Sequence, residues 1–107
     1  MYLKKQLQEM NSHQINIAVA TELQLKFTYD SYNVYKTLPS FEYKQFSPSN
    51  DCNDAITIAK NYKISINWLQ RDNGYATVTD GHNCICSDNI PRAICEIFLL
   101  TVKKLNK

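Results

Sequence analysis

Glycine is scarce in this chain. Only two glycines, Gly74 and Gly81, occur among its 107 residues. Loops that cradle the phosphates of nucleotides need several glycines at fixed spacing, because the backbone there approaches the phosphate groups closely. Two isolated glycines cannot supply such a loop, so the sequence excludes the glycine-rich nucleotide-binding motifs.

Long apolar runs are also missing. No stretch approaches the roughly 20 consecutive apolar residues that a membrane-spanning helix needs. The first ten residues, MYLKKQLQEM, are basic and then polar, and they lack the apolar centre of a secretion signal. We therefore expect a cytoplasmic protein that has no contact with a membrane.

The excess of charge is small. The net charge is +2, which does not indicate nucleic-acid binding. The lysines near the two ends of the chain are typical of solubilising tails. Nucleic acid is therefore not an expected partner.

The four cysteines include no C-x-x-C pair. His82, Cys84 and Cys86 alternate, so they would share one face of a strand. Residues two apart on a strand are separated by about 7 Å, and a single zinc ion with bonds of about 2.0–2.3 Å could not reach both His82 and Cys86. A reducing cytoplasm also disfavours disulfides. We expect free thiols, no metal site and no cofactor.

Residues for acid–base or nucleophilic catalysis are few. The only histidines are His13 and His82, and a nucleophile needs its base within hydrogen-bond distance. Proximity of His82 to Cys84 in the sequence does not establish that contact. Asp51, Asp54 and Asp88 precede or begin expected helices, where carboxylates cap the chain. We expect no catalytic residues and no enzyme.

Length and composition are those of a single globular domain over residues 1–107, with 44% hydrophobic residues. Helical spacing of apolar residues predicts three helices: residues 12–23 with Ser12 as the N-cap, a helix from near Asp51, and residues 90–104. In the last helix the expected inner stripe is Ala93, Ile94, Ile97, Phe98 and Thr101. Leu99, Leu100 and Val102 lie off that stripe, which predicts a homodimer or partner contact there.

Strand patterns occupy two parts of the sequence. Residues 25–46 are rich in aromatic and β-branched residues and predict one or two strands. Residues 63–70 alternate, with Ile64, Ile66 and Trp68 expected on one packed face. Asn73-Gly74 predicts a two-residue hairpin, and Asp80-Gly81 predicts a second turn, which together give a three-stranded antiparallel meander. The expected class is α+β, an antiparallel sheet of three to four strands with about three helices packed on it.

Four short segments resemble motifs of the NinX-like family of small phage and prophage proteins. Residues 15–20, INIAVA, are similar to its first-helix motif LDWAVA. Residues 46–51, FSPSND, are similar to its central motif YSPST, which is followed by Asp or Asn. The Ile-Ser pair at 64–65 and the Pro-x-x-Ala-type ending around residues 91–93 complete the resemblance.

The resemblance covers roughly residues 12–104, and the central motif is its distinctive part. It implies an α/β/α sandwich and a phage-encoded accessory protein in the cytoplasm of the host cell. It implies no enzymatic activity.

Two groups of residues are candidates for binding. Ser47, Ser49, Asn50 and Asp51 lie where a helix begins, and the free N–H groups of a helix start bind anions. The alternative for these residues is a simple helix cap. Tyr35 and Tyr43 belong to a stretch of aromatics interleaved with lysines. Such a stretch is typical either of a binding surface or of half-buried strands.

The sequence therefore leads to two functional hypotheses. The first is a phage or prophage accessory protein without catalytic activity that binds a host protein, for example to counter a defence system. The second is a small anionic-ligand or nucleotide-binding protein that uses the helix start at Ser47–Asp51.

Overall fold

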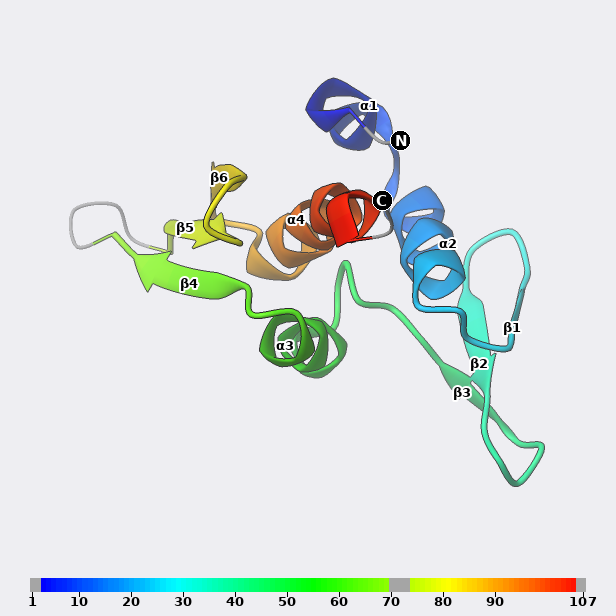
Figure 1. Cartoon of the computed structure of the whole chain (residues 1–107). Helices are drawn as coiled ribbons and strands as arrows, with labels where there is room; N and C mark the ends of the chain where they lie inside the picture. Colours follow the sequence, from blue (N-terminus) through cyan, green and yellow to red (C-terminus); the bar gives the residue numbers. More distant parts are fainter. Residues whose placement is uncertain (1–2, 70–73, 106–107) are drawn as a thin grey trace.

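The computed structural model describes residues 3–69 and 74–105 and shows an α+β fold, as predicted (Figure 1). The strands form two separate three-stranded antiparallel sheets, β1-β2-β3 and β4-β5-β6, and not the one sheet that the sequence suggested. In chain order the elements are α1 Lys4–Glu9, α2 Ser12–Glu22, β1 Phe27–Tyr29, β2 Val34–Thr37, β3 Tyr43–Gln45, α3 Cys52–Asn61, β4 Ser65–Trp68, β5 Ala76–Thr79, β6 Cys84–Ser87 and α4 Ile90–Leu105.

Helix α4 lies at the centre of the molecule, in contact with α2, α3 and the sheet β4-β5-β6 (Figure 1). Every residue from 93 to 99 is buried. A helix that packs against neighbours on several sides needs apolar residues around most of its circumference. The expected exposed face of this helix is therefore wrong: Leu99 and Val102 are buried, and Leu100 packs against the core.

Side-chain caps define the starts of α2 and α3. Asn11 Oδ1 accepts the Gln14 N–H at 2.8 Å, and Gln14 Oε1 accepts the Asn11 N–H at 2.8 Å. This reciprocal pair makes Asn11 the N-cap in place of the predicted Ser12, because a Gln three residues after Asn11 completes the capping box. The predicted cap of α3 is confirmed, since the carboxylate of Asp51 accepts two N–H groups of the first turn.

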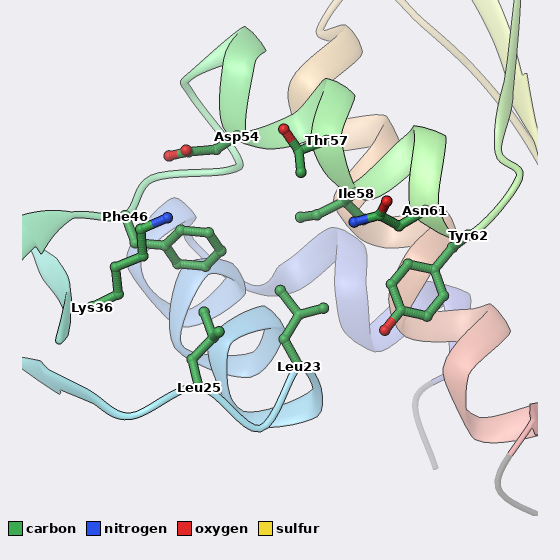
Figure 2. A pocket seen from close by; sticks show the side chains of 9 residues that line it. All are labelled: Leu23, Leu25, Lys36, Phe46, Asp54, Thr57, Ile58, Asn61 and Tyr62. Atoms are coloured by element: carbon green, nitrogen blue, oxygen red, sulfur yellow. The ribbon is translucent and has the colours of Figure 1, made fainter. Parts of the chain in front are cut away.

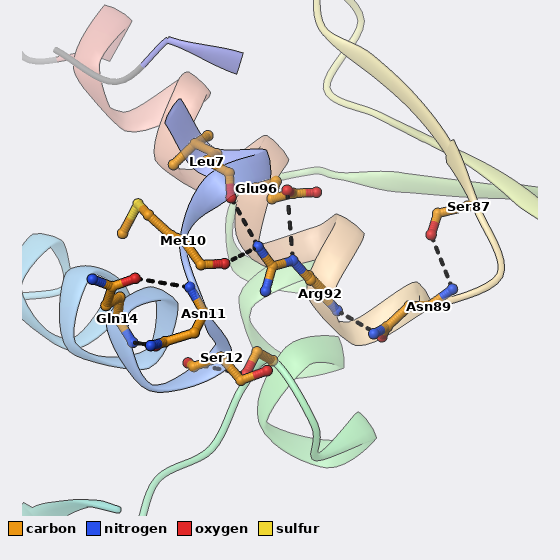
Figure 3. Close-up of polar contacts among 10 residues, drawn as sticks. Leu7, Met10, Asn11, Ser12, Gln14, Ser87, Asn89, Arg92 and Glu96 are labelled. Carbon is orange, nitrogen blue, oxygen red and sulfur yellow. Dashed lines mark hydrogen bonds and ion pairs between the residues drawn. The ribbon is translucent and has the colours of Figure 1, made fainter. Parts of the chain in front are cut away.

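Helix α1 is held against α4 by Arg92 (Figure 3). The Arg92 guanidinium donates to the Leu7 carbonyl at 2.8 Å and to the Met10 carbonyl, and its Nε lies 3.7 Å from Glu96. The carbonyls at the end of a helix lack the usual helical partner. The Leu7 carbonyl also accepts the Met10 N–H at 3.3 Å, so Arg92 adds a second donor there and supplies a donor to the Met10 carbonyl. Leu7 itself is fully buried, so α1 is part of the core.

The sheet β4-β5-β6 is the predicted meander. Its inner face aligns Ile66, Val78 and Ile85, which pair across the three strands. The predicted turn at Asp80-Gly81 joins β5 to β6, and Asp80 accepts the N–H groups of the two residues at 82 and 83. Burial alone raises the pKa of Asp80, but hydrogen bonds from the Thr101 hydroxyl and from the turn outweigh burial and lower the pKa to about 2. Thr101 thereby fixes this turn to α4.

The connection between β4 and β5 differs from the prediction. Trp68 pairs with Ala76, and the Leu69 N–H donates to the Tyr75 carbonyl at 3.1 Å. A two-residue turn centred on Asn73-Gly74 would instead place Tyr75 opposite the residue at 72 and not opposite Leu69. Gly74 has the positive φ expected of a turn glycine, +81°, whereas Asn73 lies outside the described residues.

Trp68 is not packed, contrary to the prediction. It shares the side of β4 with Ile66, but 64% of its surface is exposed. Strand β4 packs mainly on β5 and extends away from the helices (Figure 1). The alternation correctly assigned the face of Trp68, but it could not show that the helices end before reaching this position. Within the described residues, no helix is long and apolar enough to cross a membrane.

Candidate functional site

The segment Ser47–Asp51 connects β3 to α3 and is fastened to α2. The Ser49 N–H donates to Asn16 Oδ1 at 3.0 Å, and the Ser49 hydroxyl donates to the Ser12 carbonyl at 3.4 Å. Ser47 Oγ accepts from Asn16 Nδ2 at 3.4 Å. Ser49 is 1% exposed, so this side chain faces the interior of the molecule. Ser47 and Ser49 therefore form, with Asn16, a polar clamp between α2 and the start of α3.

The remaining groups of this segment also have partners within the chain. The Ser47 N–H donates to Asp54 Oδ2 at 3.0 Å, and Asn50 Nδ2 donates to Ser47 Oγ at 3.3 Å. Asp51 caps the first turn of α3. An anion at this position would compete with Asp51 for the same N–H groups and would meet the charge of Asp54. These contacts support the helix-cap alternative more than an anion site, with Asn50 and Asp51 exposed and the two serines turned inward.

Replacement of Asn16 by alanine tests the clamp. Asn16 is 4% exposed, and its loss leaves the buried Ser49 N–H without an acceptor. We expect the free energy of unfolding to fall by about 1–3 kcal/mol, the cost of an unsatisfied buried polar group. Asn50→Ala is the matched control: it also removes an amide that donates to Ser47, but at an exposed position. Urea denaturation should show a change within about 0.5 kcal/mol for that control. Equal losses in the two variants would contradict the clamp.

Tyr35 and Tyr43 are brought together on one face of the sheet β1-β2-β3. Thr37 pairs with Tyr43 and Tyr35 pairs with Gln45, so the two tyrosines are diagonal neighbours, roughly 7–8 Å apart. The opposite face carries the buried Val34 and contacts α2. The two tyrosines therefore lie on the outer face of this sheet, which is turned away from α2. Tyr43 is 65% exposed and Tyr35 is half-buried.

The loops at the two ends of this sheet carry the most exposed aromatic side chains. Tyr32, between β1 and β2, is 85% exposed, and Phe41, between β2 and β3, is 87% exposed. Phe41 also has a positive φ of +64°. Phe41 belongs to the aromatic stretch at residues 25–46, but it could not be singled out from the sequence, because no local pattern places a phenylalanine in the left-handed region.

Two other described non-glycine residues have a positive φ, and each has a structural reason. Gln24 at +58° follows the end of α2, and Lys63 at +56° follows the end of α3. A left-handed residue at that place commonly closes a helix. Phe41 closes no helix. It ends a turn in which its N–H donates to the Leu38 carbonyl at 2.9 Å, a position that glycine would fill without strain.

A cleft of about 230 Å³ lies between the end of α2, the sheet β1-β2-β3 and α3 (Figure 2). Its apolar walls are formed by Leu23, Leu25, Phe46 and Ile58. Lys36 and Asp54 lie at its Phe46 end, and Tyr62 lies at the other end (Figure 2). The cleft was not predicted, because its walls come from segments that are far apart in the sequence.

The cysteines are free thiols: Cys52, Cys84 and Cys86 are exposed and Cys95 is buried. Burial raises the pKa of Cys95 above its ordinary range, so this thiol stays protonated. In the described part of the chain, no three His, Cys, Asp or Glu side chains gather closely enough to hold a metal ion.

The segments that carry the resemblance to the NinX-like family are in contact in the folded chain. Asn16, in the first-helix motif, hydrogen-bonds to Ser47 and Ser49 of the central motif. These contacts explain what the motif residues do in this chain, but they do not identify a family, and the resemblance stays a prediction. No protein-family model, no curated protein and no solved structure matches the chain.

Proposed function

We propose that this protein acts by binding another protein through the outer face and loop ends of the sheet β1-β2-β3. This aromatic surface comprises Tyr32, Tyr35, Phe41 and Tyr43. In the setting that the resemblance implies, the protein is a phage accessory protein, the partner is a host protein, and countering a host defence system is one purpose of such binding. The observation that carries the proposal is the conformation and exposure of Phe41.

The conformation of Phe41 lowers the stability of the free protein, and burial does not offset this cost. A side chain in the left-handed region costs roughly 1–2 kcal/mol relative to a right-handed conformation. In addition, Phe41 leaves 87% of its surface in water, so burial returns almost none of that cost. Strain at an exposed aromatic side chain supports a role in contact with a partner, because binding would bury the ring that folding leaves 87% exposed.

The sheet around Phe41 supports the same proposal. Its inner face contacts α2, while the described elements leave its outer face open to solvent. Aromatic side chains are enriched at protein interfaces, where a few of them supply most of the binding energy. Tyr43 lies two residues from Phe41 and is 65% exposed, so the two rings lie close enough to contact one partner.

Phe41→Gly separates stability from binding. Glycine relieves the left-handed strain but gains freedom in the unfolded chain, so we expect the free energy of unfolding to rise by roughly 0.5–1 kcal/mol. Binding to the partner should weaken by about 30-fold or more, the effect of removing an interface anchor worth about 2 kcal/mol. Thermal denaturation measures the first effect and calorimetric titration with the purified partner measures the second.

The partner is first identified from a lysate of a bacterial host strain by its retention on the wild-type chain and its loss from Phe41→Gly. Trp68→Ala is the matched control, because it removes another exposed aromatic, 64% exposed, from the other sheet. The control should retain the partner with unchanged affinity. The proposal would be overturned if the partner bound the wild type, Phe41→Gly and Trp68→Ala equally. It would also be overturned if no host protein bound the wild type more tightly than Phe41→Gly.

A further inference from the structure

The cleft between α2, the sheet β1-β2-β3 and α3 has the size of a small-molecule site. Its volume is about 230 Å³, whereas an apolar cavity of about 150 Å³ is enough to bind benzene. The cleft therefore has room for a branched aliphatic chain or a single ring together with a small polar head. Leu23 and Leu25 approach from one side and Ile58 from the other (Figure 2), so an apolar body would be enclosed between them.

The two charged groups at the cleft lie at the same end (Figure 2). The Lys36 ammonium lies 5.8 Å from the centroid of the Phe46 ring. Asp54 accepts the Ser47 N–H through Oδ2, which leaves Oδ1 without a described protein donor. Lys36 and Asp54, both described side chains, form no ion pair with each other, so they do not neutralise each other by direct contact.

An opposite pair of charges beside an apolar cleft determines which ligands fit. A simple carboxylate at Lys36 would be repelled by Asp54, and a simple amine at Asp54 would be repelled by Lys36. A zwitterion avoids both repulsions, because its carboxylate can approach the lysine while its ammonium approaches the aspartate. The opposite end of the cleft is held in place, since the Tyr62 ring packs edge-on against Phe98 with centroids 4.7 Å apart.

We propose that this cleft binds an apolar α-amino acid of the size of leucine or phenylalanine. Its carboxylate pairs with Lys36, its ammonium pairs with Asp54, and its side chain lies between Leu23 and Ile58. This site is independent of the aromatic surface, because Lys36 lies on the inner face of the sheet and Tyr43 on the outer face.

Calorimetric titration of the full chain with leucine and phenylalanine tests the site. We expect at least one of them to bind with a Kd below about 1 mM. Three probes then separate the contributions: glycine lacks the apolar body, 4-methylpentanoate lacks the ammonium, and 3-methylbutylamine lacks the carboxylate. Each of these three probes should bind at least about tenfold more weakly than the amino acid. Equal affinity for 4-methylpentanoate, or no heat with either amino acid, would overturn the proposal.

Variants at the charged end provide a second test. Lys36→Met and Asp54→Asn should each weaken amino-acid binding by about tenfold or more. Asparagine keeps an oxygen that can accept the Ser47 N–H, so Asp54→Asn should fold. Lys44→Met is the control, because Lys44 pairs with Lys36 across the sheet but does not line the cleft. The methyl NMR signals of Leu23 and Ile58 should shift on titration with the wild type and the control. If these methyl signals shifted equally in Lys36→Met, Asp54→Asn and Lys44→Met, Lys36 and Asp54 would not bind the carboxylate and the ammonium of the ligand.

Discussion

Phe98→Ala is expected to lower the free energy of unfolding by about 3–5 kcal/mol, the cost of emptying a phenylalanine site in a closed core. Phe98 has no exposed surface, and its ring meets the Tyr62 ring at 66° with centroids 4.7 Å apart. Because α2, α3 and a sheet all pack on α4, the surrounding elements cannot collapse into the space without moving one another. Against a total stability of about 5–15 kcal/mol for a small domain, this loss brings the chain close to unfolding.

Urea denaturation followed by circular dichroism measures this effect. Ile56→Ala is the control, since it removes a similar apolar side chain from α3 at a position that is 48% exposed. Its unfolding free energy should change by no more than about 0.5 kcal/mol. If Phe98→Ala cost less than about 1 kcal/mol, the central place of α4 in the core would be wrong.

Local signals allowed much of the fold to be predicted. The α+β class, the start of α3 at Asp51 and the meander β4-β5-β6 are confirmed. Each depends on residues that are close in sequence: a carboxylate before a helix, apolar residues at helical spacing, or a turn between alternating segments.

The errors concern properties that depend on distant neighbours. Leu99 and Trp68 were assigned by the spacing of their own elements, but burial depends on what packs against those elements. Because α4 has neighbours on several sides, Leu99 is buried, and because β4 extends beyond the helices, Trp68 is exposed. The spacing of apolar residues along a helix or strand does not show how many of its faces are covered by other elements.

The candidate binding residues show the same limit. Ser49 at a helix start predicts a cap or an anion contact, whereas its N–H is taken by Asn16, which comes 33 residues earlier. Tyr35 and Tyr43 share a face because of the register between β2 and β3, which the sequence did not fix. The cleft with Lys36 and Asp54 could not be predicted, because its walls come from α2, the sheet β1-β2-β3 and α3, and their relative positions must be known first.

Arg92→Met is expected to lower the free energy of unfolding by about 3 kcal/mol, near the lower end for breaking a buried pair because Arg92 is partly exposed. The variant removes the donor to the Leu7 and Met10 carbonyls that holds α1 on α4. It also leaves Glu96, only 7% exposed, without its cation. Methionine keeps much of the apolar stem, so the loss reports the guanidinium and not the packing.

The pH dependence of this loss identifies its source. Burial raises the pKa of Glu96 in the folded protein, and Arg92 opposes that rise, so removing Arg92 raises it further. A carboxyl whose pKa is higher in the folded than in the unfolded state binds its proton more tightly when folded, and the folded state therefore gains stability as pH falls. The deficit of Arg92→Met should accordingly shrink between about pH 7 and about pH 5 in urea denaturation. The double variant Arg92→Met/Glu96→Gln should recover the part due to the unpaired carboxylate at neutral pH and lose the pH dependence. It should still show the part due to the two α1 carbonyls. A pH-independent deficit that the double variant leaves unchanged would assign the whole loss to α1 docking and contradict the role of Arg92 in neutralising Glu96.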